Sequence, residues 1–124
     1  MNKQLAERAV ACPRWRWLPG MRSVSHGGHS RRLDPPSNAR GLHPWWTWSQ
    51  GECGEGLPDL SDPATVGCLL ALVREAWGDR YVYAMRLNVR RQIWVVHVPS
   101  DRHNIHGEGE TEAEALVAAL EAAP

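Results

Sequence analysis

The stretch from Leu60 to Gly78 constrains the fold of this chain more than any other. Asp62 followed by Pro63 is typical of a helix start, with an N-cap residue and then a proline at the first helical position. Gly78 is suited to the left-handed conformation that ends a helix. Between them runs one apolar stripe, formed by Val66, Leu69, Leu70, Val73 and Trp77. Burial of such side chains contributes roughly 1.5–3 kcal/mol each, so we expect this helix to be the central core element.

Length and charge exclude several classes of protein. The chain has 124 residues, enough for one domain with a modest core, and at 43% hydrophobic it is not disordered by composition. Fourteen basic and 14 acidic side chains give a net charge of zero, which argues against extended nucleic-acid binding or a membrane-surface role. No apolar run approaches the ~20 residues of a membrane span, and no signal peptide is visible. We expect a cytoplasmic protein without membrane contact.

The cysteines are odd in number and far apart. Cys12, Cys53 and Cys68 form no Cys-x-x-Cys motif, so the sequence predicts free thiols in a reduced compartment.

Further helices and strands are expected on both sides of the central helix. An amphipathic helix is expected at 3–12, and Pro13 is expected to end it. Thr111-Glu112-Ala113-Glu114 is a capping box in front of an Ala- and Leu-rich segment, and it predicts a C-terminal helix. Alternating segments around Gly27-Gly28 predict one hairpin, and similar segments after the central helix predict another. The expected strands are 21–26, 29–33, 81–87 and 93–98.

This element order predicts an α+β fold. We expect an antiparallel sheet of four to five strands packed with three helices, on one or both faces, in the order α-β-β-loop-α-β-β-α. Residues 1–124 are expected to form a single domain with a long irregular segment at 34–59, which holds a candidate short strand at Trp45-Trp46-Thr47-Trp48. Loops of that length in a small domain are often functional.

Three motifs resemble small phage-encoded proteins. They are the Leu-Ala-Glu-Arg helix followed by a Trp-rich segment (LAERAV and WRW), the Asp-Pro-Ala-Thr helix that ends in Trp, and the closing Glu-Ala-Glu-Ala-Leu helix. Together they resemble the phage α-β-α sandwich type, and LPDLSDPATVGCLLALVREAWGD resembles uncharacterised proteins of phages and prophages. The similarity covers the first ten residues, 57–79 and 109–123. It implies a fold and a phage setting, and it carries over no catalytic residue.

Two His-x-x-His pairs raise the question of a metal site. His26 and His29 flank the Gly-Gly turn, and His103 and His106 lie in an expected loop. This spacing places two imidazoles on one metal when it occurs on a helix, but no third and fourth ligand stands nearby. We interpret these side chains as solvated turn histidines and expect no metal.

Motifs for covalent or cofactor chemistry are missing from the sequence. There is no Gly-x-Ser-x-Gly, no phosphate-binding Gly-x-x-x-x-Gly-Lys and no Gly-x-Gly-x-x-Gly. Gly107-Glu108-Gly109 stands ahead of a helix start, but its acidic neighbours would repel an anion, so we interpret it as part of the capping loop. We expect neither an enzyme nor a cofactor.

Residues 14–48 carry the most informative pattern for function. The chain has seven Trp and no Phe, and this stretch combines most of the Trp with Arg and His. Arg forms bidentate contacts with phosphate, and Trp stacks on bases for about 1–3 kcal/mol per base. The alternative is a small Trp-anchored core surrounded by solvated arginines. The candidate ligand-binding residues are Arg22, His26, His29, Arg31, Arg32, Arg40, Trp45, Trp46 and Trp48.

The phage resemblance turns this pattern into two functional hypotheses. In the first, the protein is a counter-defence binding protein that sequesters a nucleotide-type immune signal in the host cytoplasm, as a homo-oligomer. In the second, it inhibits a host defence complex by protein–protein contact, as an anti-CRISPR does, through exposed Trp or its acidic C-terminal part. A phage accessory protein without a small ligand remains a third alternative.

Overall fold

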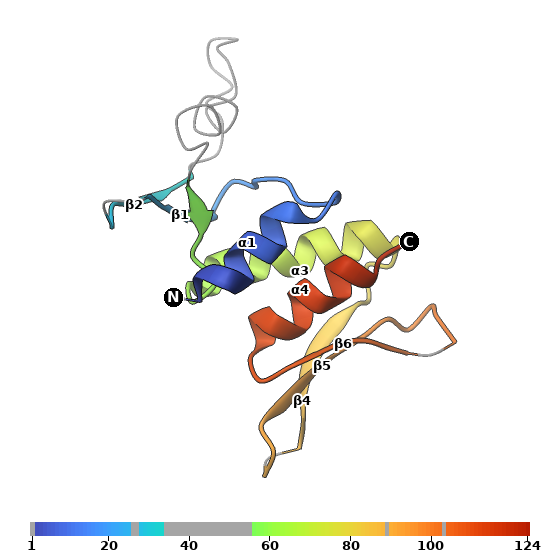
Figure 1. Cartoon of the computed structure of the whole chain (residues 1–124). Coiled ribbons are helices and arrows are strands. Elements are labelled where there is room, and N and C mark those ends of the chain that lie inside the picture. The colour runs from blue at the N-terminus through green and yellow to red at the C-terminus, as the bar shows by residue number, and fades with distance from the viewer. Residues whose placement is uncertain (1, 26–27, 34–55, 89, 103) are drawn as a thin grey trace.

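The computed structural model describes residues 2–25, 28–33, 56–88, 90–102 and 104–124 (Figure 1). Three helices and two three-stranded antiparallel sheets lie within these ranges, so the α+β class is confirmed. In chain order the elements are α1 (Lys3–Ala11), β1 (Arg22–Val24), β2 (Ser30–Arg32), β3 (Leu57–Pro58), α3 (Pro63–Trp77), β4 (Tyr83–Asn88), β5 (Ile93–His97), β6 (Ile105–Gly109) and α4 (Glu112–Ala122).

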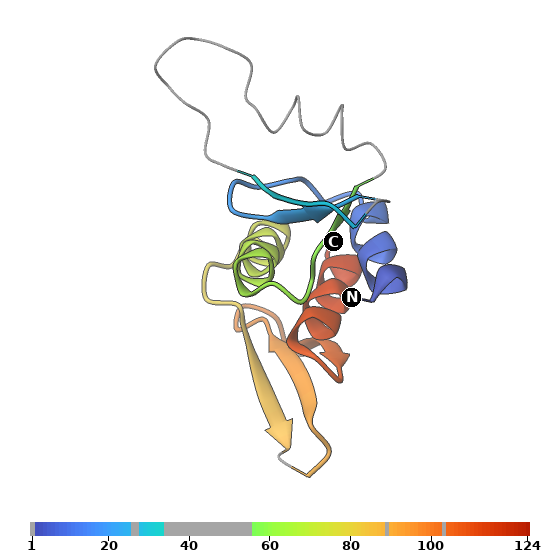
Figure 2. The same cartoon turned by 90° about the vertical axis from the view of Figure 1, so that its left-hand side faces the viewer.

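The strands form two sheets and not the single sheet expected. Sheet A has the order β2-β1-β3, and sheet B has the order β4-β5-β6. Helices α3 and α4 lie between the two sheets, with α1 beside them (Figures 1 and 2). The expected strand count and element order are not confirmed, because the described residues include two strands, β3 and β6, that the sequence did not predict. The expected strand at Trp45–Trp48 lies outside the described residues.

Helix α3 begins and ends where the sequence predicts. The Asp62 side chain accepts a hydrogen bond from Thr65 N–H (3.0 Å), Pro63 occupies the first turn, and Gly78 has φ +62°. The buried face is rotated from the expected stripe, because β1 crosses the helix start and Arg22 N–H donates to Thr65 Oγ1 (2.8 Å). Buried side chains are Thr65, Leu69, Leu72, Val73 and Ala76, whereas Val66, Leu70 and Trp77 are half-buried.

The two terminal helices also follow their sequence signals. Asn2 caps α1 by accepting from Leu5 N–H (3.1 Å), and Thr111 caps α4 by accepting from Glu114 N–H (3.1 Å). The Glu114 carboxylate accepts in turn from Glu110 N–H, at 2.8 Å. These bonds satisfy donors that a helix start otherwise leaves without partners.

One continuous core joins the helices to both sheets. Side chains from α1, α3 and α4 meet residues just outside β1 and β2 and one face of sheet B. The larger members are Leu5, Met21, Leu33, Leu60, Leu69, Leu72, Val73, Val82, Val96, Val98, Leu116, Val117 and Leu120.

Strand β6 corrects the interpretation of Gly107-Glu108-Gly109 as a capping loop. Both glycines lie within the strand and face α4. A Cβ on Gly107 would lie 2.1 Å from the Ala115 carbonyl oxygen, and one on Gly109 would lie 2.4 Å from Glu114 Cβ. Glycine is therefore required here because the strand backbone lies directly against the helix.

None of the helices in the described part of the chain is both long and apolar enough to cross a membrane.

Candidate ligand-binding site

The β1–β2 hairpin places arginines opposite one another. Its register pairs Arg22 with Arg32 and Ser23 with Arg31. Directly opposed side chains of an antiparallel pair share one face, so Arg22 and Arg32 bring two positive charges together. Such a pair is destabilising unless an acid lies near it.

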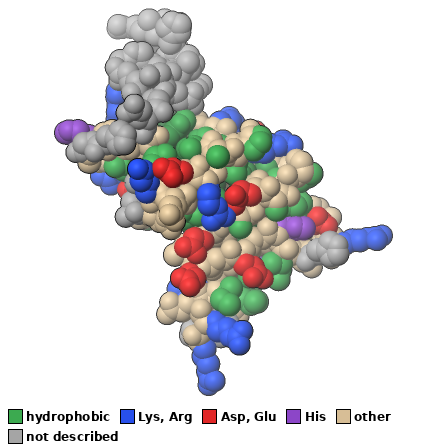
Figure 3. Space-filling view, in the orientation of Figure 1, with side chains coloured by type: hydrophobic (Ala, Val, Ile, Leu, Met, Phe, Trp, Pro, Cys, Tyr) green, Lys and Arg blue, Asp and Glu red, His purple; other side chains and the backbone are tan. Residues whose placement is uncertain are grey.

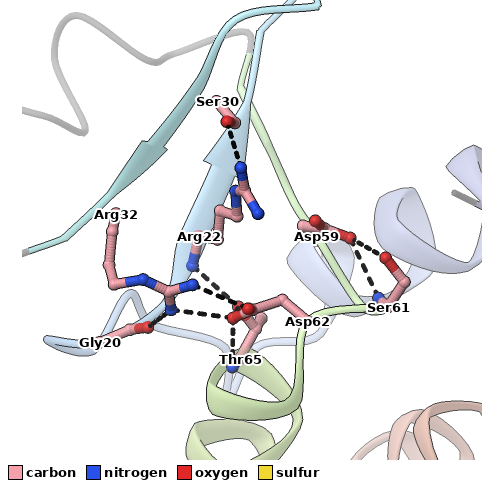
Figure 4. Close-up of polar contacts among 8 residues, drawn as sticks. All are labelled: Gly20, Arg22, Ser30, Arg32, Asp59, Ser61, Asp62 and Thr65. Atoms are coloured by element: carbon pink, nitrogen blue, oxygen red, sulfur yellow. Dashed lines mark hydrogen bonds and ion pairs between the residues drawn. The ribbon is translucent and has the colours of Figure 1, made fainter.

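Asp62, the N-cap of α3, supplies that acid. Arg32 Nη1 and Nη2 lie 2.9 and 2.8 Å from the two Asp62 carboxylate oxygens, a bidentate ion pair (Figure 4). Arg32 Nη1 also donates to the Gly20 carbonyl oxygen, at 2.8 Å. The Asp62 side chain is only 10% exposed. Arg32, and then Thr65, hold the pKa of Asp62 far below its usual range by donating hydrogen bonds to the carboxylate. Arg32 therefore fastens the hairpin to the start of α3.

The described part of the hairpin carries three further cationic or titratable side chains, those of Arg22, His29 and Arg31. Arg22 Nη2 donates to Ser30 Oγ at 2.7 Å, within the hairpin itself (Figure 4). Arg31 and His29 are exposed, and the His29 carbonyl oxygen accepts from Ser25 N–H at 2.9 Å. Guanidinium groups with exposed donors on a short hairpin are suited to phosphate or carboxylate oxygens.

Four of the candidate residues, Arg22, His29, Arg31 and Arg32, therefore lie on one hairpin, with Arg22 and Arg32 on one face and Arg31 on the other. The other five, His26, Arg40, Trp45, Trp46 and Trp48, lie outside the described residues.

Two earlier tryptophans fit the alternative of a Trp-anchored core. Trp15 and Trp17 form an edge-to-face pair with ring centroids 5.5 Å apart, and both pack partly buried against the core. The flanking arginines are held at the surface: Arg14 donates to the Pro124 carbonyl oxygen (2.6 Å), and Arg16 pairs with Glu75. These four side chains therefore support the fold.

Sequence reasoning missed a pocket of about 570 Å³ at the end of α3. Its lining includes Arg74, Arg80, Tyr81 and Ser100. The Arg80 guanidinium lies 4.9 Å from the Tyr81 ring centroid and donates to the Tyr81 hydroxyl at 2.8 Å. Asp79 accepts from Tyr81 N–H and Ser100 N–H, which lowers the pKa of its carboxyl. The signal in the sequence was the cluster Asp79-Arg80-Tyr81 directly after the helix-ending glycine.

The described histidines are His29, His97 and His106. His106 lies in β6, not in a loop as expected, with Nε2 3.0 Å from Asp101 Oδ2 and its ring centroid 4.2 Å from that of Trp77. Among the described residues there is no group of three or more His, Cys, Asp or Glu side chains arranged to hold a metal ion. His26 and His103 fall outside that part of the chain.

Two of the three cysteines are described, and both are free thiols. Burial raises the pKa of the Cys12 and Cys68 thiols, so neither has the thiolate character of a nucleophile. Cys53 lies in the part that the structure leaves undescribed.

Comparison with known proteins assigns the chain to no family. No protein-family model, curated protein or solved structure matches it.

Proposed function

We propose that the protein acts by binding and not by catalysis, and that its ligand is a nucleotide-type anion held at the β1–β2 hairpin. One observation carries this proposal: three arginines, Arg22, Arg31 and Arg32, emerge from a single short hairpin beside the start of α3. Arg22, opposite Arg32, supplies a second guanidinium group on the same face of the hairpin, and Arg31 supplies one on the other face. Phosphate groups match that geometry because each guanidinium can donate two parallel hydrogen bonds.

The phage resemblance suggests what such binding achieves. A protein that sequesters an immune signal needs affinity and abundance but no reactive group, which agrees with a site built from Arg and His side chains. We therefore propose a counter-defence role in the host cytoplasm, with a signalling nucleotide as ligand. A homo-oligomer would present several hairpins at once.

A thermal-shift experiment tests the proposal. Pure protein is mixed with ATP and a panel of cyclic oligonucleotides, each at increasing concentration. A ligand that binds only the folded state stabilises it by about 2.7 kcal/mol at a hundredfold excess over Kd. We expect at least one cyclic oligonucleotide to raise Tm in a concentration-dependent way. The absence of a shift with every nucleotide tested would overturn the proposal.

Two variants locate the site, and a third serves as the matched control. Arg22→Gln and Arg31→Gln remove hairpin charges, and we expect each to weaken binding. Arg80→Gln removes an arginine from the pocket at the end of α3 and should leave binding unchanged. If instead only Arg80→Gln weakens binding, the ligand occupies that pocket and the hairpin assignment is wrong.

A protein–protein inhibitor is the second candidate, favoured by an acidic surface. Glu108, Glu110, Glu112 and Glu114 lie around the start of α4, and Figure 3 shows acidic side chains gathered there. Such a surface suits a basic groove on a host defence complex. Loss of inhibition in Glu110→Lys, with nucleotide binding intact, would favour this function over the first.

A further inference from the structure

The two faces of sheet B are covered differently. Ala84 and Val96, a cross-strand pair, face the core under α4. The neighbouring pairs Tyr83 with His97 and Met85 with Val95 therefore point away from it. Val95 is fully buried yet does not belong to the core cluster, as expected for a side chain covered by its neighbours on the opposite face. The outer face of sheet B comprises Tyr83, Met85, Leu87, Val95, His97, Ile105 and Glu108.

This outer face is unusually apolar for a surface. Of the five large hydrophobic side chains that are exposed in the described part of the chain, four lie on it. Leu87 is 55% exposed, Tyr83 44%, and Met85 and Ile105 37% each. The Tyr83 and His97 rings stack across β4 and β5, with centroids 5.0 Å apart and 10° between their planes. Contiguous apolar patches on a soluble domain mark interaction surfaces.

We propose that the occupant of this face is a second copy of the same chain, packed sheet on sheet. Two sheets that pack face to face lie about 10 Å apart with their strands aligned to within about 30°. A two-fold axis parallel to the strands satisfies that arrangement, and it places β4 of one copy over β6 of the other. An isologous interface must be self-complementary. The charges around the outer face of sheet B must therefore match those of the second copy.

The charges are complementary under this axis. Arg90 and Arg91 lie in the turn between β4 and β5, at one end of the sheet. Glu108 lies near the same end of β6, paired with Val95, and Glu110 follows it. Laying β4 over the partner's β6 therefore brings the basic turn of each copy toward the acidic strand of the other. The contact occurs twice, once on each side of the axis and both times at the same end of the two sheets, while the apolar side chains pack against one another over the rest of the face.

The proposed dimer leaves the hairpin of sheet A accessible. Sheets A and B lie at opposite ends of the molecule, with α3 and α4 between them (Figure 2). Pairing through sheet B would present two β1–β2 hairpins pointing away from the interface. The inference does not depend on the proposed ligand, because it rests on sheet B alone.

Sedimentation velocity over a range of concentrations tests the dimer. The face spans only three short strands, so we expect a reversible dimer with Kd on the order of 10 µM. Met85→Lys puts a charge on the apolar face, directly beside Val95 of the central strand, and should give a monomer at every concentration. The matched control is Ala71→Lys at an exposed position of α3, which should remain dimeric. A wild-type protein that stays monomeric at millimolar concentration would overturn the proposal, as would a dimer that survives Met85→Lys.

A charge-reversal experiment distinguishes this geometry from loss of folding. Arg91→Glu and Glu108→Arg each place like charges together twice in the dimer, and each alone should raise Kd about tenfold. Mixing the two variants restores both contacts in the heterodimer, whose Kd should return to that of the wild type. Lys3→Glu, on α1, is the control and should change nothing. A mixture that associates no better than the separate variants would refute the axis parallel to the strands.

Discussion

At the scale of single residues, Asp62 links the two halves of the described structure. Its carboxylate caps α3 through Thr65 N–H and holds the Arg32 guanidinium in a bidentate pair. The first contact is local, and the Asp-Pro signal predicted it. The second joins residues 30 positions apart, and no local pattern announces it. Arg32, a candidate ligand-binding residue, is consequently also part of the fold.

Substitutions at position 62 should separate the two roles. Asp62→Ala removes the cap and the ion pair, whereas Asp62→Ser removes the pair and keeps a side chain that caps well. We expect the Ser variant to be the more stable of the two by about 1 kcal/mol, because a lost cap costs 0.5–2 kcal/mol. Urea unfolding measures the difference. Arg32→Ala should destabilise the wild type but add little to Asp62→Ser. Equal stabilities of the Ser and Ala variants would contradict the capping role.

The same carboxylate predicts how stability depends on pH. The pKa of Asp62 is lowered in the folded state, so folding favours the ionised form. The stabilisation is fully present above the unfolded-state pKa of about 3.9 and is lost progressively as pH falls below it. Unfolding free energies at pH 5, 4 and 3 should therefore drop less steeply in Asp62→Asn than in the wild type. A residual slope should remain, because the pKa of Asp79 is lowered too. Parallel pH profiles would count against the ion pair.

At the scale of elements, the contact between β6 and α4 depends on small residues. Gly107 and Gly109 let the strand backbone approach the helix at Ala115 and Ala119. Local sequence predicts a loop at these glycines, because glycine is depleted in strands and the segment carries acids. The segment is a strand because it pairs with β5. The residues of β6 alone do not indicate that pairing.

Two glycine-to-alanine variants should therefore have opposite effects. Gly107→Ala forces a Cβ against the Ala115 carbonyl oxygen and should destabilise the protein by about 1–3 kcal/mol, as overpacking does. Gly67→Ala, inside α3, meets no atom within 4 Å and should stabilise by roughly 0.5–1 kcal/mol. Thermal unfolding monitored by circular dichroism distinguishes them. A tolerated Gly107→Ala would mean that β6 does not pack this closely.

Trp77 joins α3 to α4 by a hydrogen bond that can be tested in the same way. Its Nε1 donates to the Ala119 carbonyl oxygen at 2.9 Å, so Trp77→Phe should lose about 1 kcal/mol beyond the change in buried area. Trp15→Phe is the comparison, because the buried Trp15 Nε1 has no hydrogen-bond partner among the described residues. We expect the Trp15 variant to be the less destabilised in urea. The reverse order would contradict the α3–α4 bond.

At the scale of the whole molecule, local signals located the elements but not their assembly. The pattern at 3–12 before Pro13 and the helix caps at Asp62 and Thr111 predicted the three helices. The segments around Gly27-Gly28 and the alternation in 81–87 and 93–98 predicted the two hairpins. The third strand of sheet A is β3, which is only two residues long, and the third strand of sheet B is β6, which is rich in glycine. Neither strand has a clear local signal in the sequence. The sequence likewise placed Arg22 and Arg32 near one another, since they flank one turn, but it could not show that Asp62 binds Arg32.

The assembled molecule offers two separate surfaces. The β1–β2 hairpin is basic, and the outer face of sheet B, which lies at the other end of the molecule, is apolar (Figures 1 and 2). We therefore propose that ligand capture and self-association use different faces. A substitution on one face should then abolish one of these two activities and leave the other intact.

Chemical-shift mapping tests the central proposal, nucleotide binding at the hairpin, most directly. ¹⁵N-labelled protein is titrated with each cyclic oligonucleotide of the panel, and amide shifts are assigned along the chain. We expect one cyclic oligonucleotide to produce saturable amide shifts concentrated in residues 20–33 and 59–65, around the Arg32–Asp62 pair. Titrations that leave these amides unmoved, or that shift only the strands of sheet B, would contradict it.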